Sequence, residues 1–380
     1  MRFPGFSGEW KSRKIGDDCS VLMCKRIFAN QTSEQGDVPF YKIGTIGAEP
    51  DAYISRELFE EYKAKYNYPR KGEVMVTCAG TVGKTIVFDG TDSYYQDSNI
   101  VWLSNPKQLY INPFLNYFLS RVNWNKLNST TITRIYNDNL RELAIKYPSV
   151  KEQEKIVSLL SLLDQRIAVQ SKVIEDLKKL KTAISRIVFN FPIKGRALLR
   201  DLIVTGKAGG TPTSSNKSYY DGGIPFLSIN DISKQGKYIA YTDNHLSEAG
   251  LRVSSAWIVP AGSLILSMYA SVGLPAINKV PLATSQAMFA MVLKQPNTID
   301  YLYYYLCFFK ERFIYRYLET GTQSNINAEI VRTLEIPDYG EKNLMIGRIL
   351  SIVDERIANE EKTALVYNQQ KSYLMSKMFI

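Results

Sequence analysis

The chain has 380 residues and carries 47 Lys and Arg against 37 Asp and Glu, a formal net charge of +10. At roughly 150 residues per domain, this length predicts two or three domains. A hydrophobic content of 45% with 22% charged residues excludes a disordered or collagen-like chain. The basic excess favours a polyanionic partner. The single histidine, His245, argues against histidine-based metal sites and a Ser-His-Asp triad.

The four cysteines form no CxxC pair, which argues against a zinc site and indicates a reduced, cytoplasmic protein. The N-terminal residues contain no apolar signal core. The longest apolar stretch, 301–309, is far shorter than the roughly 20 residues that a membrane span needs. We therefore expect no targeting segment, no membrane segment and no bound metal.

Residues 1–148 have the pattern of a mixed α/β module. Residues 73–78 and 85–88 are rich in β-branched and apolar residues, which predicts two strands. Ser55 precedes an amphipathic stretch and is a predicted helix N-cap. Asn112 followed by Pro113 predicts the start of a further helix.

Residues 149–190 predict one long helix. There is no Gly or Pro from Lys151 to Phe189, and Ser149 with Glu152 three residues later is a typical helix start. Apolar residues recur with the spacing of three and four that is typical of a coiled-coil seam. The predicted seam comprises Leu160, Leu163, Ile167, Ile174, Leu177, Leu180, Ile184 and Ile187.

The second half of the chain repeats this order. Residues 156–167 recur as residues 346–357 at an offset of 190, and six of the twelve positions are identical. Residues 191–338 predict a second module, with strands at 263–268 and 275–277 and a helix at 299–318. Residues 339–380 predict a second long helix with its own seam, comprising Leu350, Val353, Ile357, Ala364, Tyr367, Leu374 and Met378. The chain is therefore predicted to be a tandem duplication of two α/β modules on two similar helices.

Two polar residues, Gln170 and Glu360, occupy the same seam position in the two helices. A polar residue there can fix the register and pairing of the helices at some cost in stability. The alternative is that both lie at a solvated edge of the seam.

Three motifs imitate catalytic sites. The stretch 80–85 resembles a phosphate-binding loop, but Cys78 stands where the pattern GxxxxGK[ST] requires Gly. Asp51 with residues 61–63 imitates a nuclease pattern, although the latter lie in a predicted helix. Asn112-Pro113-Phe114 resembles the NPPF/Y motif of amino-methyltransferases with one proline missing. We therefore expect no catalytic residues in this chain.

Several segments together resemble the specificity subunit of type I restriction-modification systems. They are the N-terminal FPGFSGEW, the GTVGK stretch at 80–84, KEQEKI at 151–156, the GTPT turn at 210–213, GIPFLSI at 223–229, and the Ser-x-x-Asp-x-Arg-Ile stretch that starts at Ser161 and Ser351 in the two long helices. The resemblance covers essentially the whole chain. The second copy departs from it at 341–346, which lacks the Glu-Gln pair of 152–153.

The resemblance implies an α+β protein with two target-recognition domains, 1–148 and 191–338. Each would read one half of a split double-stranded DNA site. It also implies that the helices 149–190 and 339–380 pack antiparallel as a spacer and dock two modification (methyltransferase) subunits. Restriction (translocase and nuclease) subunits complete such a complex. The resemblance places S-adenosylmethionine, ATP and Mg²⁺ on these partner subunits and no cofactor on this chain.

Base reading requires amide, hydroxyl and guanidinium groups on exposed loops. The candidate DNA-binding residues of the first module are Lys42, Thr77, Thr81, Lys84, Gln96, Asn99 and Arg134, and those of the second are Ser228, Asn230, Tyr269, Ser271, Gln286, Gln323 and Asn325. The alternative for each is a solvated turn or a backbone cap. The candidate helix-pairing residues are Leu160, Leu163, Ile167, Gln170, Ile174, Leu177, Leu350, Val353, Ile357, Glu360, Ala364 and Tyr367.

Two alternatives to a DNA-reading subunit remain open. One is a stand-alone enzyme, which would need an intact cofactor or phosphate loop. The other is a coiled-coil adaptor, or an inactive drifted copy, that binds proteins without reading DNA.

Overall fold

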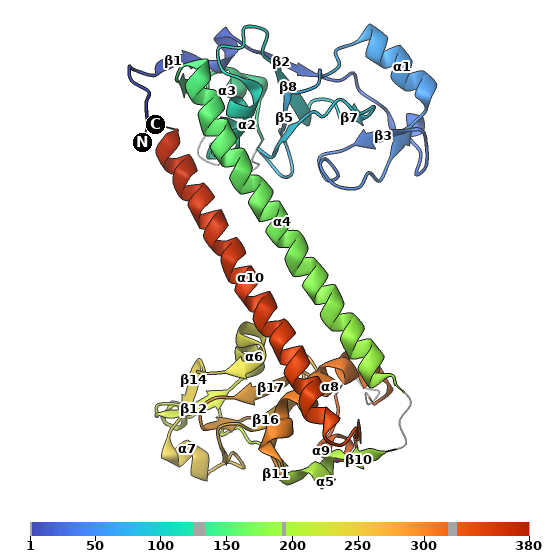
Figure 1. Cartoon of the computed structure of the whole chain (residues 1–380), viewed down its shortest axis with the longest axis vertical. Coiled ribbons are helices and arrows are strands. Elements are labelled where there is room, and N and C mark those ends of the chain that lie inside the picture. The colour runs from blue at the N-terminus through green and yellow to red at the C-terminus, as the bar shows by residue number, and fades with distance from the viewer. Residues whose placement is uncertain (1, 125–133, 192–194, 318–324, 380) are drawn as a thin grey trace. The chain divides into compact units, whose positions relative to one another are not determined.

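The computed structural model describes residues 2–124, 134–191, 195–317 and 325–379 (Figure 1). The chain divides into two compact units, of which unit 1 comprises residues 1–170 and 363–380 and unit 2 comprises residues 171–362. Each unit contains one module together with one part of each long helix, α4 (Val150–Phe189) and α10 (Lys342–Met378). The predicted domain boundaries at 148, 190 and 338 lie close to the ends of these helices, whereas the compact units divide both helices near their middle.

Unit 1 contains three sheets, with strand orders β2-β8-β5-β6, β4-β3-β7 and β1-β9. Its strands are β1 (Lys11–Lys14), β2 (Ser20–Met23), β3 (Val38–Tyr41), β4 (Tyr53–Ile54), β5 (Val74–Thr77), β6 (Thr85–Val87), β7 (Tyr94–Tyr95), β8 (Ile100–Ser104) and β9 (Ala144–Tyr147). Its shorter helices are α1 (Arg56–Lys65), α2 (Asn112–Ser120) and α3 (Asn137–Arg141). As predicted, Ser55 caps α1 by accepting a hydrogen bond from the amide of Leu58 at 3.2 Å.

Unit 2 repeats this arrangement with one further strand in each of its two larger sheets, and its strand orders are β11-β19-β16-β17-β13, β14-β12-β18-β15 and β10-β20. Its strands are β10 (Arg196–Leu198), β11 (Ile203–Ala208), β12 (Ile224–Leu227), β13 (Tyr238–Ile239), β14 (Asn244–Leu246), β15 (Ile258–Val259), β16 (Leu264–Ser267), β17 (Pro275–Asn278), β18 (Leu282–Thr284), β19 (Met288–Leu293) and β20 (Glu335–Pro337). Its shorter helices are α5 (Leu199–Leu202), α6 (Ile229–Gln235), α7 (Glu248–Arg252), α8 (Ile299–Arg312) and α9 (Ala328–Arg332).

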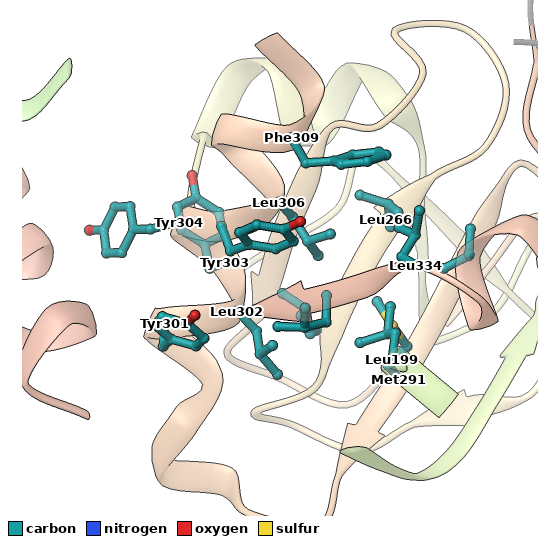
Figure 2. Packing of buried hydrophobic residues seen from close by; sticks show 14 of the residues in the cluster. Leu199, Leu266, Met291, Tyr301, Leu302, Tyr303, Tyr304, Leu306, Phe309 and Leu334 are labelled. Atoms are coloured by element: carbon teal, nitrogen blue, oxygen red, sulfur yellow. The ribbon is translucent and has the colours of Figure 1, made fainter. Parts of the chain in front are cut away.

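The central strands β5 and β16 are buried on both faces, and their successive side chains face opposite sides of the sheet. In β5, Val74 and Val76 face the cluster that contains α2 and the ends of the long helices, while Met75 faces the cluster beneath α1. In unit 2, Leu266 of β16 faces α8, and Figure 2 shows Leu306 and Phe309 of α8 lying on the side of Leu266. The same alternation therefore places one helix, α2 or α8, between the sheet and the long helices.

In unit 1, a cluster of Tyr117, Asp164 and Lys371 joins α2 to both long helices. The hydroxyl of Tyr117 donates to Oδ2 of Asp164 at 2.7 Å, and Lys371 Nζ lies 2.5 Å from Oδ1 of the same carboxylate. The ammonium also lies 5.7 Å from the centre of the Tyr117 ring. Burial and the neighbouring carboxylate raise the pKa of Tyr117, so that its hydroxyl stays a donor.

Unit 2 contains the same cluster with the contributions of the two long helices exchanged. Tyr304 of α8 donates to Oδ2 of Asp354 at 2.7 Å, and Lys181 Nζ lies 2.6 Å from Oδ1. Asp354 is the repeat counterpart of Asp164, and Lys181 that of Lys371, each at an offset of 190. Within each unit, the carboxylate thus comes from one long helix and the ammonium from the other. We call these two sets of residues the Tyr-Asp-Lys clusters.

The long helices run antiparallel where they pair within unit 2. Lys178 pairs with Glu361 at 2.7 Å and Lys181 with Asp354 at 2.6 Å, so residue numbers rise on α4 as they fall on α10. Of the predicted seam, Leu180 and Ile187 are wrong, because 48% and 71% of these side chains are exposed.

The seam instead continues through Lys181, Ile184 and Val188, which keeps the alternation of three and four unbroken from Leu160. Lys371 occupies the matching position between Tyr367 and Leu374 on α10. Glu360 does not lie at a solvated edge of the seam, since its side chain is only 12% exposed and pairs with Arg356. Both lysines of the Tyr-Asp-Lys clusters are therefore seam residues.

We predict that Asp354→Ala destabilises unit 2 by about 1–3 kcal/mol, because the Tyr304 hydroxyl and the Lys181 ammonium lose their shared acceptor. Urea unfolding of the full chain measures the change. The control is Glu355→Ala, which removes an exposed carboxylate from the adjacent position of the same helix. Equal decreases in the free energy of unfolding for the two variants would contradict a structural role for the cluster.

Candidate nucleic-acid interface

The turn between β5 and β6 is held by a buried hydroxyl. Thr77 Oγ1 donates to the carbonyl of Thr81 and accepts from the amide of Lys84 at 3.0 Å. Gly83 completes this turn with a φ of 80°, a conformation that favours glycine.

The turn between β16 and β17 has the same construction at an offset of 190. Ser267 Oγ donates to the carbonyl of Ser271 at 2.7 Å and accepts from the amide of Leu274 at 2.8 Å. Gly273 has a φ of 78°, matching Gly83. The two modules therefore share one turn geometry, although their sequences have diverged.

The prediction that Thr77 contacts DNA is corrected by this arrangement. Its side chain is 0% exposed, and its hydroxyl is already engaged on both sides of the turn. A side chain without exposed surface cannot reach a base edge, so Thr77 shapes the turn rather than reading DNA. Thr81, in the same turn, is exposed.

Three loops meet beside each turn. In unit 1 the amide of Cys78 donates to the carbonyl of Asn99 at 2.8 Å, and the amide of Ile135 donates to the carbonyl of Cys78 at 2.9 Å. In unit 2 the amide of Met268 donates to Ala287 at 2.7 Å, and that of Ile326 donates to Met268 at 3.0 Å. We call the residues around each meeting point the loop junction. In unit 1 it comprises residues 77–84, 96–99 and 134–136, and in unit 2 it comprises residues 267–274, 284–287 and 325–327.

The loop junction of unit 1 brings together several of the predicted residues. Arg134 donates to Oδ1 of Asn99 at 3.3 Å and to the hydroxyl of Ser98 at 3.2 Å. Gln96 follows β7, beside the end of the parallel strand β3, and its Oε1 accepts from the amide of Ile43 at 3.2 Å. These amide and guanidinium groups line one pocket of about 360 Å³ together with Lys42.

The two predicted lysines of unit 1 are engaged within the protein. Lys84 donates from Nζ to the carbonyl of Ile46 at 2.6 Å, although the residue as a whole is exposed. Lys42 Nζ lies 3.1 Å from Oδ1 of Asp51. A phosphate contact by either lysine would therefore have to compete with a partner in the protein itself.

The loop junction of unit 2 presents a different set of side chains. Tyr269 and Ser271 are exposed on the turn, and Gln286 accepts from the hydroxyl of Thr211. Ala270 and Ser271 have φ values of 39° and 46°, which are strained for residues other than glycine. Such strain tends to be concentrated at functional sites.

The remaining predicted residues of the second module lie apart from the turn or outside the described residues. Asn325 is half-buried beside Ile326 in the loop junction. Ser228 caps α6, where its hydroxyl donates to Asp231 Oδ2 at 2.6 Å, so the backbone cap accounts for this residue. Asn230 is exposed on the first turn of α6. Gln323 lies outside the described residues.

The motifs that imitate catalytic sites have structural roles. Residues 80–85 form the turn between β5 and β6 rather than a loop that leads into a helix. Asp51 pairs with Lys42, while Glu61 lies on α1. Among the described residues, no group of three or more His, Cys, Asp or Glu side chains is placed to hold a metal ion.

Two buried residues of α4, Glu152 and Gln153, attach the first module to this helix. Glu152 is 0% exposed and accepts from Arg2 at 2.6 Å and 3.2 Å. Gln153, also 0% exposed, accepts from the amide of Ile111 and donates to the carbonyls of Leu109 and Pro148. Glu152 therefore pairs with a side chain of the module, whereas Gln153 satisfies its backbone groups.

A family model described as the type I restriction modification DNA specificity domain matches the chain twice, over residues 7–179 and 199–366. The chain belongs to this family. The two matched regions correspond to the two modules with most of their long helices.

Relatives and a solved structure agree with this assignment. A type I restriction enzyme specificity subunit of Haemophilus influenzae is 53% identical over 147 residues, which are 39% of this chain and 38% of that protein. The MjaIX specificity subunit of Methanocaldococcus jannaschii is 28% identical over 178 residues, 45% of this chain and 40% of that protein. The chain thus matches two fifths or less of either relative's length.

The chain is similar in fold to the crystal structure of a type I restriction-modification S subunit from M. genitalium, with a TM-score of 0.64 and 15% sequence identity. The match covers 100% of this chain and 99% of that subunit. The predicted fold class, two tandem α/β modules with two long helices, is confirmed. Among the described residues, no helix is long and apolar enough to cross a membrane.

We predict that Thr77→Val accelerates hydrogen exchange at the Lys84 amide, because valine keeps the shape but removes the acceptor of that amide. Thr81→Val, in the same turn but with an exposed side chain, is the control and should leave this amide protected. Hydrogen-exchange mass spectrometry of both variants gives the comparison. Unchanged protection in Thr77→Val would show that the hydroxyl does not hold the turn.

Proposed function

We propose that this chain is the DNA-recognition subunit of a type I restriction-modification complex. Each module reads one half of a bipartite double-stranded DNA site, and the paired helices set the spacing between the halves. The observation that carries this proposal is that the same loop junction occurs in both modules with different side chains. Where unit 1 has Ser98 and Asn99, unit 2 has Gln286 and Ala287 on the equivalent backbone.

Two such surfaces on one scaffold suit the reading of two unrelated half-sites. The backbone hydrogen bonds hold each junction in the same form, while amide, hydroxyl and guanidinium groups supply the donors and acceptors that distinguish base edges. The net charge of +10 adds attraction to phosphates that does not depend on sequence.

We further propose that the chain itself is not catalytic and that modification subunits supply adenine methylation. In this proposal S-adenosylmethionine, ATP and Mg²⁺ bind to the modification and restriction subunits. The turn at 80–85 supports this, because its lysine faces the Ile46 carbonyl and no phosphate-binding helix follows.

The long helices carry outward-facing apolar residues that suit the docking of these modification subunits. The exposed apolar side chains on α4 include Leu162, Val169, Val173, Leu180 and Ile187, and those on α10 include Met345, Ile349, Ile352, Val366 and Tyr373. Leu162 and Ile352 are repeat counterparts, and each is 55% exposed. This symmetry favours two identical partners, one for each unit.

Adenine-methylation mapping of DNA from a host that carries this protein with its modification subunits tests the proposal. A bipartite methylated sequence is the expected result. Exchanging residues 1–148 for the module of a related protein should change one half-site and leave the other intact. A change in both half-sites would contradict independent reading, and the absence of any sequence-specific methylation would favour the adaptor alternative.

We predict that Leu162→Glu weakens binding of the modification subunit at least tenfold, because a charge would be buried in an apolar contact. Gln165→Glu adds the same charge at an exposed position one turn further along α4 and is the control. Calorimetric titration of the purified subunits measures both affinities. If the two variants bind equally well, Leu162 lies outside the docking surface.

A further inference from the structure

Segment 26–32, which follows β2, forms a wall of the unit 1 pocket of about 360 Å³. The same pocket is lined by Gln96, Asp97, Asn99 and Arg134 of the loop junction. The pattern of the sequence did not single out this segment. Its contribution to the pocket therefore adds a fourth loop to the surface at which unit 1 is proposed to read DNA.

Arg26 is the basic residue that this segment brings to the pocket. Its side chain is 68% exposed, yet its guanidinium is supported on two sides. Nε lies 3.7 Å from Oδ2 of Asp97, and the guanidinium carbon lies 5.6 Å from the centre of the Phe28 ring. Among the residues that the structure describes, no hydrogen bond engages the two terminal nitrogens of Arg26.

Phe28 has no evident role in the core, because 57% of its side chain is exposed. A large apolar ring on the surface is unfavourable unless it contacts something. Here its face lies under a guanidinium, an arrangement that restricts the rotation of the arginine side chain. Phe28 and Asp97 together favour one position of the guanidinium before any ligand arrives.

This support suits a base edge better than a phosphate. A guanidinium held through Nε keeps both terminal N–H groups for one planar acceptor pair, and guanine presents such a pair, O6 and N7, in the major groove. A phosphate would place a second anion close to the Asp97 carboxylate, which is 22% exposed, and the two anions would repel each other. The neutral acceptors of guanine carry no such penalty.

We propose that Arg26 reads a guanine in the half-site of the first module, and that Asp97 and Phe28 are positioning residues for its guanidinium. This inference rests on the proposed function, since it assumes that unit 1 reads DNA. It assigns one G·C base pair of that half-site to a bidentate contact from the segment after β2.

Methylation mapping of the complete complex with variant specificity subunits tests the assignment. Arg26→Ala and Arg26→Lys should each relax one G·C position of the first half-site and leave the second half-site unchanged. The loss of discrimination expected from one bidentate contact is about 5- to 150-fold. The lysine variant keeps the charge and thereby separates base reading from attraction to phosphate.

The matched control is Lys25→Ala, which removes the neighbouring exposed cation. Lys25 Nζ lies 5.3 Å from the centre of the Tyr66 ring, away from Asp97 and Phe28. We expect this variant to keep every position of the recognised sequence. Asp97→Asn and Phe28→Ala should weaken discrimination at the same G·C position as Arg26→Ala, which a merely structural role would not do.

A second measurement avoids mutation of the protein. Duplexes in which 7-deazaguanine replaces the assigned guanine lack the N7 acceptor, and the wild-type complex should bind them at least fivefold more weakly than the parent duplex. Arg26→Ala should bind both duplexes equally. Uniformly reduced methylation with an unchanged recognised sequence would overturn the proposal and make Arg26 a phosphate contact. The absence of a bipartite sequence with the wild-type protein would instead refute the proposed function.

Discussion

The architecture depends on a helix carboxylate that is shared between a tyrosine of the module and a lysine of the other long helix. Asp164 and Asp354 each accept from a tyrosine hydroxyl and lie within 2.6 Å of a lysine ammonium. A partly buried carboxylate needs such hydrogen-bonding and charged partners to offset the loss of its contacts with water. Because carboxylate and ammonium come from different halves of the duplicated chain, neither half alone can complete a cluster. In each unit, the contacts of this one carboxylate therefore fix the register of the two helices and attach the module to them.

The sequence reveals the repeat and the seam but misplaces two seam positions, Leu180 and Ile187. The offset of 190 is visible because Asp164 and Asp354 lie in stretches that share six of twelve residues. Since apolar residues normally form a coiled-coil seam, the sequence favours Leu180 over Lys181, and only the three-dimensional pairing shows that Asp354 neutralises the lysine. The partner in the module, Tyr304, lies in a diverged segment, so no local pattern points to it.

For the candidate DNA-reading surface, the sequence predicts loops better than individual side chains. The segments around residues 81, 96–99 and 134 do converge at one junction, because backbone hydrogen bonds join the strand end at Cys78 to two distant loops. Whether a hydroxyl faces solvent or its own turn depends on the conformation of that turn, which explains why Thr77 is buried while Thr81 is exposed. The segment that contains Arg26 was missed because its neighbour across the pocket, Asp97, is 71 residues away in the chain.

Each module is attached to the long helices by two sets of contacts, one common to both units and one that differs between them. The common set is the hydrogen bond from a tyrosine on α2 or α8 to the carboxylate of a long helix. The second set differs between the units. In unit 1 Arg2 pairs with Glu152, whereas in unit 2 Lys237 donates to the hydroxyls of Tyr304 and Ser351 at 3.0 Å each. A module that keeps the tyrosine can therefore change its remaining contacts, including those of its exposed loops, without altering the helix pair. Under the proposed function, such separation of attachment from reading would allow one scaffold to carry two surfaces of different specificity.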